Sequence, residues 1–499
     1  MESGLYREQA TLALTGRCRD AAPVNLGPLD ATILATYVGA VVAFGIWNGR
    51  RNRSAEDFMV GGRDLPWWAL LLSIVATETS TVTFLSVPGV AWQGDLTFLQ
   101  LPLGYIAGRL AVSFLLLPRF FRGKFFTAYE VLHERFGPDV RRVTSLLFLV
   151  TRTLGDGLRL FLGAIVLQHV AGLDLTTSVV LLGIATIAYT LVGGIRAVVW
   201  TDAVQLVVYL GGAAIALVLM IQAVDGGLDA IVDTARADGK LRVFDFGFDL
   251  AQPYQFWAGM IGGFVVAFGT HGVDQLMVQR YLCARSEHQA RLALALSGPA
   301  VFLQFAFFLV IGTALYAFYA QHPPDRPFAR SDEVFASFIV DELPAGVLGI
   351  VLGAVFSAAM STLSSSLNST ATALVHDLLP AREDEMRLRL AKLATIGFGI
   401  AQISVGIAGP MLQRLDDSII GLALAIQSYA LGIILGVFAL GRWSSDRNAA
   451  LFGIAIGLTA TSCAAWSGGI AWPWFVLIGS TASFSSGMLA HLWLRKRWS

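Results

Sequence analysis

Long apolar stretches alternate with short polar segments along almost the whole chain. A helix that crosses a bilayer needs roughly 20 mostly apolar residues. The pattern therefore predicts an all-α integral membrane protein with about thirteen transmembrane helices. Their approximate ranges are 29–47, 66–92, 97–118, 143–168, 174–193, 198–224, 255–276, 296–320, 345–378, 390–410, 418–440, 448–468 and 472–494.

A polar leader, residues 1–28, precedes the first helix and lacks the cleavage pattern of a signal peptide. Thirteen crossings place the two ends of the chain on opposite sides. Cytoplasmic loops are usually enriched in lysine and arginine. With the leader outside, the inner segments carry 23 of the 35 cationic residues and the outer segments nine. We therefore expect a plasma-membrane protein (bacterial-type inner membrane) with an extracellular or periplasmic N-terminus and a short cytoplasmic tail.

Composition narrows the functional classes. Hydrophobic residues make up 55% and charged residues 14% of the 499 residues, whereas soluble domains carry about 25% charged residues. The net charge is zero, so no basic excess attracts nucleic acid. The three cysteines lie far apart and form no disulfide framework. No polar segment is long enough for an ATPase or a signalling domain. The sequence thus predicts a channel or a transporter driven by a gradient, not an enzyme.

The second predicted helix contains a polar break. Residues 73–89 read SIVATETSTVTFLSVPG, with Glu78 among hydroxyl side chains and Pro88-Gly89 after them. Unwound backbone at membrane depth is tolerated where it lines a cavity, and its freed carbonyl oxygens are cation ligands. Packing of small hydroxyl residues between helices is the alternative.

A similar break, FGTHGVDQ, interrupts the seventh helix at 268–275. Broken helices in corresponding positions of two halves indicate the binding site of a transporter built from inverted repeats. We expect the repeats to cover 66–224 and 255–440, with two more helices in 448–499. His271 in this break is interpreted as a hydrogen-bonding wall residue, and Arg280 after it as an inner-face anchor.

The ninth helix carries SAAMSTLSSSLNSTATALVHD over 357–377. Residues three and four apart share a helical face, so these hydroxyls form continuous patches. Oxygen ligands without a carboxylate suit a monovalent hard cation better than a divalent one. Helix packing is the alternative, and Asp202 on the sixth helix could be a helix cap or the negative partner of a bound cation.

The fourth helix carries Arg152, Asp156 and Arg159 on one face. The spacing fits a buried ion network. It also leaves open that Asp156 or Arg159 faces a charged or polyhydroxyl substrate.

Four motifs together resemble the sodium:solute symporter family: ATETSTVTFLSVPG, GGIRAVVWTDAVQ, DQLMVQRYL and SAAMSTLSSSLNSTATALVHD. The resemblance spans about residues 29–440. It implies a LeuT-like fold with two inverted five-helix repeats. It also implies a main sodium site at Ala76, Thr79, Ala358, Ser361 and Thr362, and a second sodium site at Asp202, Ser361, Ser364 and Ser365.

The solute pocket departs from the family pattern. Ser80 and Thr83 match hydroxyls that hold a carboxylate in sialic acid transporters, but the arginine of those proteins is Gly155 here and a pocket glutamine is Pro102. These differences count against sialic acid, and Thr83 in place of a sugar-binding glutamine counts against glucose or galactose. Glu78 lies where proline transporters carry a coupling aspartate. Glu78, Ser80, Thr83, Asp156, Arg159, Asp274 and Gln275 form the expected substrate and coupling set.

The resulting hypothesis is sodium-coupled symport of a small polar organic solute, namely a sugar, amino acid or organic acid, by alternating access. Proton coupling through Glu78 or His271, or a solute sensor that does not transport, are the alternatives. Sodium is the expected coupling ion, and membrane lipid is an expected partner. No nucleic acid and no obligate protein partner are expected.

Overall fold

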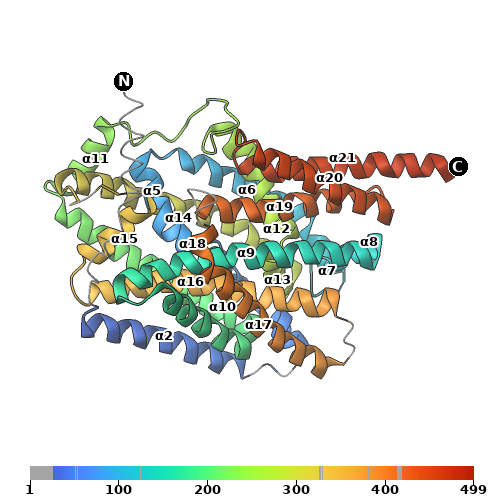
Figure 1. Cartoon of the computed structure of the whole chain (residues 1–499), viewed down its shortest axis with the longest axis horizontal. Helices are drawn as coiled ribbons and strands as arrows, with labels where there is room; N and C mark the ends of the chain where they lie inside the picture. The colour runs from blue at the N-terminus through green and yellow to red at the C-terminus, as the bar shows by residue number, and fades with distance from the viewer. Residues whose placement is uncertain are drawn as a thin grey trace.

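The computed structural model describes residues 26–498 apart from 51, 53, 124, 325–326, 329, 380–382 and 413–418. In this part of the chain every regular element is helical, and the only β contact is a bridge between Leu65 and Ala284. Most long helices run along one direction, which is horizontal in Figure 1. The predicted leader, residues 1–28, lies almost wholly outside the described residues.

The helices of the first half follow the predicted apolar stretches closely. Asp174 caps the start of α10 by accepting a hydrogen bond from the Thr177 amide, which satisfies one of the free N–H groups of the first turn. The bounds are α2 Pro28–Gly49, α3 Ala55–Val60, α4 Trp67–Glu78, α5 Thr81–Gln93, α6 Gln100–Leu115, α7 Leu117–Arg122, α8 Glu130–Phe136, α9 Pro138–Ala171, α10 Leu175–Ala223 and α11 Gly227–Ala237.

The second half begins with a π-helical turn, Ala258–Gly262, that leads into α12. Ser286 and Asp446 cap α14 and α20 with their side chains. The bounds are α12 Gly263–Val273, α13 Gln275–Leu282, α14 Glu287–Gln321, α15 Asp332–Asp341, α16 Val347–Ala373, α17 Asp384–Ile407, α18 Gly409–Leu412, α19 Ile419–Leu440, α20 Arg447–Trp466 and α21 Pro473–Trp498.

Nine of the described helices are long and apolar enough to cross a membrane, and two bent pairs raise this number to eleven. The sequence pattern predicted thirteen. One missing span is α9, which carries Arg152, Asp156 and Arg159 and is not among the helices that are long and apolar enough. The other results from α10, which runs through the predicted gap between 193 and 198 and therefore counts once.

The long α10 is folded back at Gly194, where the backbone has φ 55° and ψ −163°. A Cβ there would lie 2.7 Å from the Phe58 carbonyl oxygen, so only glycine fits. The Asn52 side chain donates to the Gly193 carbonyl at 2.7 Å and seals the turn. Two membrane-crossing segments are thus joined without an intervening loop.

Two helix pairs are sharply bent near the middle of the molecule. The axes of α4 and α5 differ by 58°, and those of α12 and α13 by 56°. Between α4 and α5, Thr79 and Ser80 have extended backbone angles. Asp274 is extended between α12 and α13. Both predicted breaks are therefore present.

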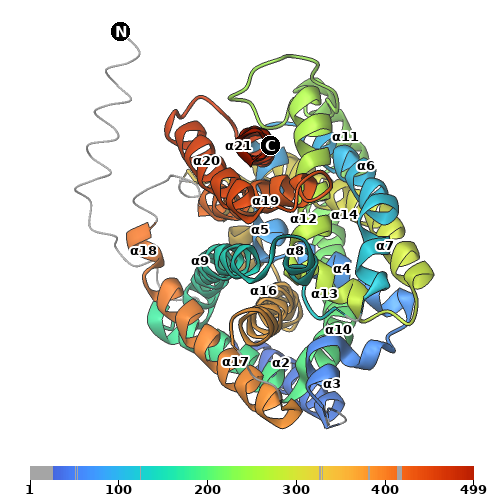
Figure 2. The same cartoon turned by 90° about the vertical axis from the view of Figure 1, so that its right-hand side faces the viewer.

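The α16 helix lies in the centre of the bundle. In its most apolar stretch of 18 residues, 89% is buried inside the protein. Figure 2, which looks along the helices, shows α16 among α9, α10, α2 and α17. A helix covered on all sides can place its hydroxyl groups against several neighbours at once.

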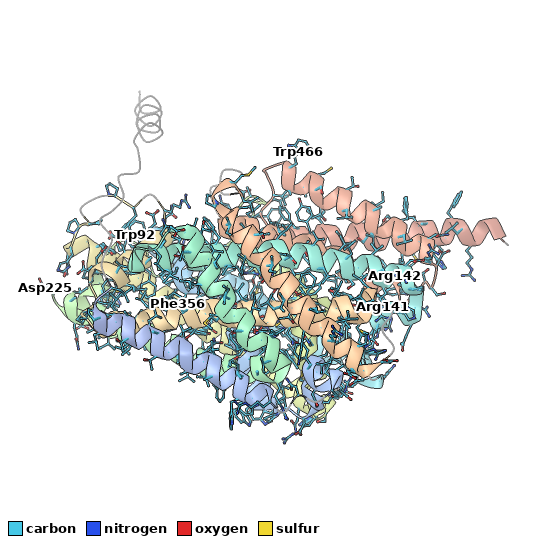
Figure 3. The ribbon with its side chains drawn as sticks, turned by 60° about the horizontal axis from the view of Figure 1, so that its bottom comes forward. Trp92, Arg141, Arg142, Asp225, Phe356 and Trp466 are labelled. Carbon is cyan, nitrogen blue, oxygen red and sulfur yellow. The ribbon has the colours of Figure 1, made fainter. Side chains whose placement is uncertain are left out.

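The loops at the two ends of the bundle differ in charge. In Figure 1, α11 and α15 lie at one end and α7 and α8 at the other. Figure 3 shows Arg141 and Arg142 at the α8 end and Asp225 at the α11 end. Two arginines from one predicted inner segment thus lie at the opposite end of the molecule from an aspartate of one predicted outer segment.

Candidate functional site

The α16 hydroxyls predicted to bind sodium meet the last turn of α4. The final carbonyl groups of a helix have no intrahelical partner, and the break after Glu78 leaves them open. Thr362 Oγ1 lies 3.4 Å from both the Thr77 and the Ala358 carbonyl oxygens. Ala76, Ala358 and Thr79 are buried. Of the main predicted set, Thr362 thus contacts both the last turn of α4 and Ala358, whereas the Ser361 hydroxyl bonds to Asp202 and the Thr79 hydroxyl bonds to the Val75 carbonyl.

Asp202 of α10 faces the same α16 surface. Ser361 Oγ donates to Asp202 Oδ1 at 2.7 Å, and Ser73 Oγ donates to Asp202 Oδ2 at 2.6 Å. The carboxylate therefore lies in the protein interior and does not cap a helix at the membrane surface. Ser364 Oγ instead donates to the Ser361 carbonyl of its own helix. Of the second predicted set, Asp202 and Ser361 are in direct contact.

The cation beside Asp202 is Arg280, which the sequence analysis interpreted as an inner-face anchor. That interpretation is wrong, because Arg280 is fully buried. Its Nη2 lies 3.0 Å from Asp202 Oδ2 and also donates to Thr77 and Ser365, and its Nε donates to Ser73 Oγ at 2.9 Å. Ser365 thereby reaches the Asp202 cluster through a guanidinium. One of the 23 cations counted as cytoplasmic belongs to the interior.

Glu78 at the end of α4 is held by two other helices. Arg109 of α6 forms an ion pair with its carboxylate, and His271 Nε2 lies 2.7 Å from Glu78 Oε1. His271 Nδ1 contacts the Tyr281 hydroxyl, and Arg109 also donates to Ser297. His271 thus makes the hydrogen-bonding contacts expected of a wall residue.

The charged face of α9 reaches the second break. Arg152 forms an ion pair with Asp274, and its Nη1 lies 3.7 Å from Asp156 Oδ2. Arg159 pairs with Asp156 and donates to Gln427 Oε1 of α19 at 2.8 Å. The predicted ion network is present, and it includes Asp274 from the broken helix.

Asp274 and Gln275 have different partners. Asp274 Oδ1 caps α13 by accepting from the Leu276 amide at 3.0 Å. The Gln275 side chain accepts from the Ala128 amide at 2.8 Å and donates to the Phe126 carbonyl at 2.9 Å. Both ends of the Gln275 amide group therefore hold the loop before α8.

Among the described residues, four hydroxyl groups near the two breaks lack a strong protein partner, and one of them is the buried Thr81 hydroxyl at the start of α5. Ser80 precedes α5 without capping it, and Thr83 Oγ1 reaches the Glu78 carbonyl only at 3.5 Å. Buried Tyr129 Oη has no hydrogen-bond partner among the described residues. It lines a cavity of about 10 Å³ beside Arg152 and Asp274, which is room for about one water molecule.

The arrangement matches known transporters in sequence and in structure. Residues 58–457 match the Sodium:solute symporter family. The chain belongs to this family.

Three curated relatives match most of this symporter. The human sodium/iodide cotransporter is 31% identical over 469 residues, which is 92% of this chain and 71% of that protein. A sodium/sialic acid symporter of Proteus mirabilis is 29% identical over 480 residues, 93% of this chain and 95% of that one. Sodium-coupled monocarboxylate transporter 2 of Danio rerio is 29% identical over 441 residues, 86% of this chain and 70% of that one.

Solved structures of transporters are also similar to this chain. The substrate-bound, outward-open structure of a sodium-coupled sialic acid symporter has a TM-score of 0.85 at 28% identity, covering 93% of this chain and 98% of that chain. A nucleobase-cation-symport-1 family transporter has a TM-score of 0.56 at 14% identity, covering 89% and 96%, which supports the LeuT-like fold. This symporter is a multi-pass membrane protein that couples small-solute transport to sodium, and it is not an enzyme.

Several residues of the symporter site were not predicted. Gln304 of α14 donates to Thr79 and also to Tyr209 Oη at 2.6 Å. The sequence analysis also gave no role to Arg109, which pairs with Glu78. A buried ionisable residue in an apolar helix requires a partner, and this rule is the signal that could have linked Arg109 and Arg280 to nearby carboxylates.

The charges of the site balance. Each of four arginines lies within 4 Å of a carboxylate: Arg109–Glu78, Arg152–Asp274, Arg159–Asp156 and Arg280–Asp202. None of these eight side chains is more than 15% exposed. The protein side of the site is therefore neutral with all eight groups ionised.

Proposed function

We propose that this symporter carries a monovalent organic anion, such as a monocarboxylate, together with sodium. The balance of four arginines and four carboxylates supports this proposal. A sodium ion entering a neutral, buried site adds one positive charge, which is costly in a low-dielectric interior. A monoanion beside it removes that charge, whereas a neutral sugar or a zwitterion does not.

The coupled sodium ion would occupy the main site, at Ala76, Thr79, Ala358, Ser361 and Thr362. Backbone carbonyls and hydroxyls from α4 and α16 supply oxygen ligands, and their approach across the break would order the end of α4. At the second site, Arg280 already neutralises Asp202. A sodium ion there would share the carboxylate with a guanidinium, so we propose that it binds more weakly.

The solute would lie between the two breaks and α9. Ser80, Thr83 and Tyr129 offer hydroxyl groups, and Arg152 and Arg159 offer positive charge close by. The names of three relatives specify iodide, sialic acid and monocarboxylates. Gly155 and Pro102 replace two groups that resemblance assigns to sialic acid binding, which favours a smaller anion.

The transport cycle then follows from linked binding. Sodium would stabilise the form in which α4 and α16 are drawn together, and the anion would bind that form more tightly. The membrane potential contributes about 2.3 kcal/mol per charge per 100 mV. Cotransport of one sodium ion and one monoanion moves no net charge, so the sodium concentration gradient would supply the work.

A thermal-shift screen of the purified protein tests the solute class. Lactate, pyruvate, iodide, sialic acid, glucose and proline are each added in sodium and in potassium. A carboxylate that raises the melting temperature only in sodium supports the proposal. Stabilisation by glucose or proline, but by no anion, contradicts it. Uptake of the hit into proteoliposomes under a sodium gradient or a pH gradient then separates symport from proton coupling and from sensing alone.

We also propose the orientation derived from the cation count, with the N-terminus outside and the C-terminus cytoplasmic in the plasma membrane. The meeting of Arg141, Arg142 and the α7 arginines at one end of the bundle supports it (Figures 1 and 3). A C-terminal green fluorescent protein fusion in a bacterial host should fluoresce. A C-terminal alkaline phosphatase fusion that is active instead would reverse the orientation.

A further inference from the structure

A cavity of about 350 Å³ lies apart from the ion and solute sites, at the end of the bundle predicted to face the cytoplasm. It opens between the start of α4, the folded joint of α10 and the segment before α14. These pieces come from three segments that the cation count places on the inner side. The lining includes Asn48, Asp64, Trp68, Arg196, Trp200 and Arg285.

The lining combines positive charge with interfacial aromatic groups. Arg196 and Arg285 both approach Asp64, at 3.5 and 2.9 Å, so the cavity has one unmatched positive charge. Among the residues that the structure describes, the buried Nε atom of Arg196 has no hydrogen-bond partner. Trp68 is 44% exposed and packs edge-on against Trp200 at 5.2 Å between ring centroids. Tryptophan favours the headgroup level of a bilayer.

We propose that this cavity binds the headgroup of an anionic phospholipid from the surrounding leaflet. The phosphate would accept hydrogen bonds from Arg196 and Arg285, and the exposed Trp68 would lie against the glycerol and upper acyl chain. Basic pockets between transmembrane helices commonly suit such headgroups. The exposed Trp68, packed on Trp200 beside the arginines, favours a lipid over a free phosphate ion, which would not need an apolar neighbour.

Occupancy would tie three segments together. Leu65, at the start of α4, already bonds through its amide to the Cys283 carbonyl at 3.0 Å. A headgroup between Arg196 and Arg285 would add a second link beside it. Trp68 and Trp200 lie on α4 and α10, the helices that carry Ser73 and Asp202. We therefore expect bound anionic lipid to stabilise the folded protein.

The test uses the full chain, delipidated in a neutral detergent. Phosphatidylglycerol, phosphatidylcholine and inorganic phosphate are added separately, and melting temperature and lipid retention by native mass spectrometry are followed. Phosphatidylglycerol should raise the melting temperature, whereas the other two should not. The R196Q/R285Q variant should bind phosphatidylglycerol about thirtyfold more weakly. The R442Q/R447Q variant removes the same charge elsewhere at that end and should bind like the parent.

The D64N variant separates a lipid site from a merely structural ion pair. Removal of the competing carboxylate should tighten phosphatidylglycerol binding, whereas loss of a structural pair would lower stability without tightening it. This variant remains informative if R196Q/R285Q fails to fold. Equal effects of inorganic phosphate and phosphatidylglycerol, or unchanged lipid binding in both R196Q/R285Q and D64N, would overturn the proposal.

Discussion

The two broken helices occupy corresponding positions but have different chemistry. At the break between α4 and α5, the Thr77 carbonyl oxygen of the last α4 turn faces the Thr362 hydroxyl of α16. At the break between α12 and α13, Asp274 is occupied by Arg152 and by the Leu276 amide. Both breaks thus carry a buried ion pair, Glu78–Arg109 at the first and Asp274–Arg152 at the second, and we propose that only the first also offers carbonyl and hydroxyl oxygens to a cation. Similar geometry supports two functions because different side chains meet each break.

The largest expected effect comes from the second break. Arg152→Gln leaves Asp274 buried without its cation, which typically costs about 3–5 kcal/mol. The variant should lose most of its folding stability, as measured by thermal unfolding. Adding Asp274→Asn should restore stability but not carboxylate-dependent stabilisation. Carboxylate binding that returns with stability would remove Arg152 from the solute site.

The next effect comes from the first break. Ser361→Ala with Thr362→Ala removes two hydroxyl ligands of the proposed main site. We expect the sodium concentration for half-maximal thermal stabilisation to rise at least about tenfold, since a hydrogen-bonded or ligating group is worth about 1 kcal/mol. Ser369→Ala, about two turns away on α16 with its hydroxyl bonded to the Ser366 carbonyl of the same helix, is the matched control and should change it less than about twofold. Equal effects of the two variants would place the ion elsewhere.

A smaller effect is expected at Ser80. Its hydroxyl caps no helix and is proposed to contact the solute. Ser80→Ala should weaken binding of the carboxylate about three- to tenfold, while the sodium dependence measured without solute stays unchanged. A change in sodium affinity alone would indicate that this hydroxyl binds the sodium ion and not the solute. The first break would then bind only the ion.

The smallest expected effect concerns the second sodium site, beside Asp202. If Arg280 makes the second sodium site weak, Ser365→Ala should leave the sodium dependence within about twofold of the parent. Sodium titrations followed by thermal shift measure this. A loss as large as that of the Ser361 and Thr362 variant would indicate two ions of similar affinity.

Much of this arrangement is readable from local sequence. Polar runs in apolar helices located both breaks, and helical periodicity grouped Ser361 with Thr362 and Arg152 with Asp156. Contacts between side chains far apart in the chain could not be predicted from the sequence. Arg280 and Asp202 are separated by 78 positions, and nothing local distinguishes a buried arginine near a helix end from one that reaches the membrane surface. The break predicted at 194–197 coincides with the kink of α10 at Gly194, but its length was not predicted, because a single glycine makes the turn.

That joint has a consequence for how the chain tolerates change. Exposed polar loops usually accept inserted peptides, because little packing is disturbed. The turn at Gly194 has no spare residue, contacts Phe58 and is closed by Asn52. An epitope inserted after Gly193 should therefore abolish expression, whereas one inserted after Gly468, in the exposed segment 466–469, should be accepted. A reporter peptide must therefore be placed away from Gly194, where the chain has no room for extra residues.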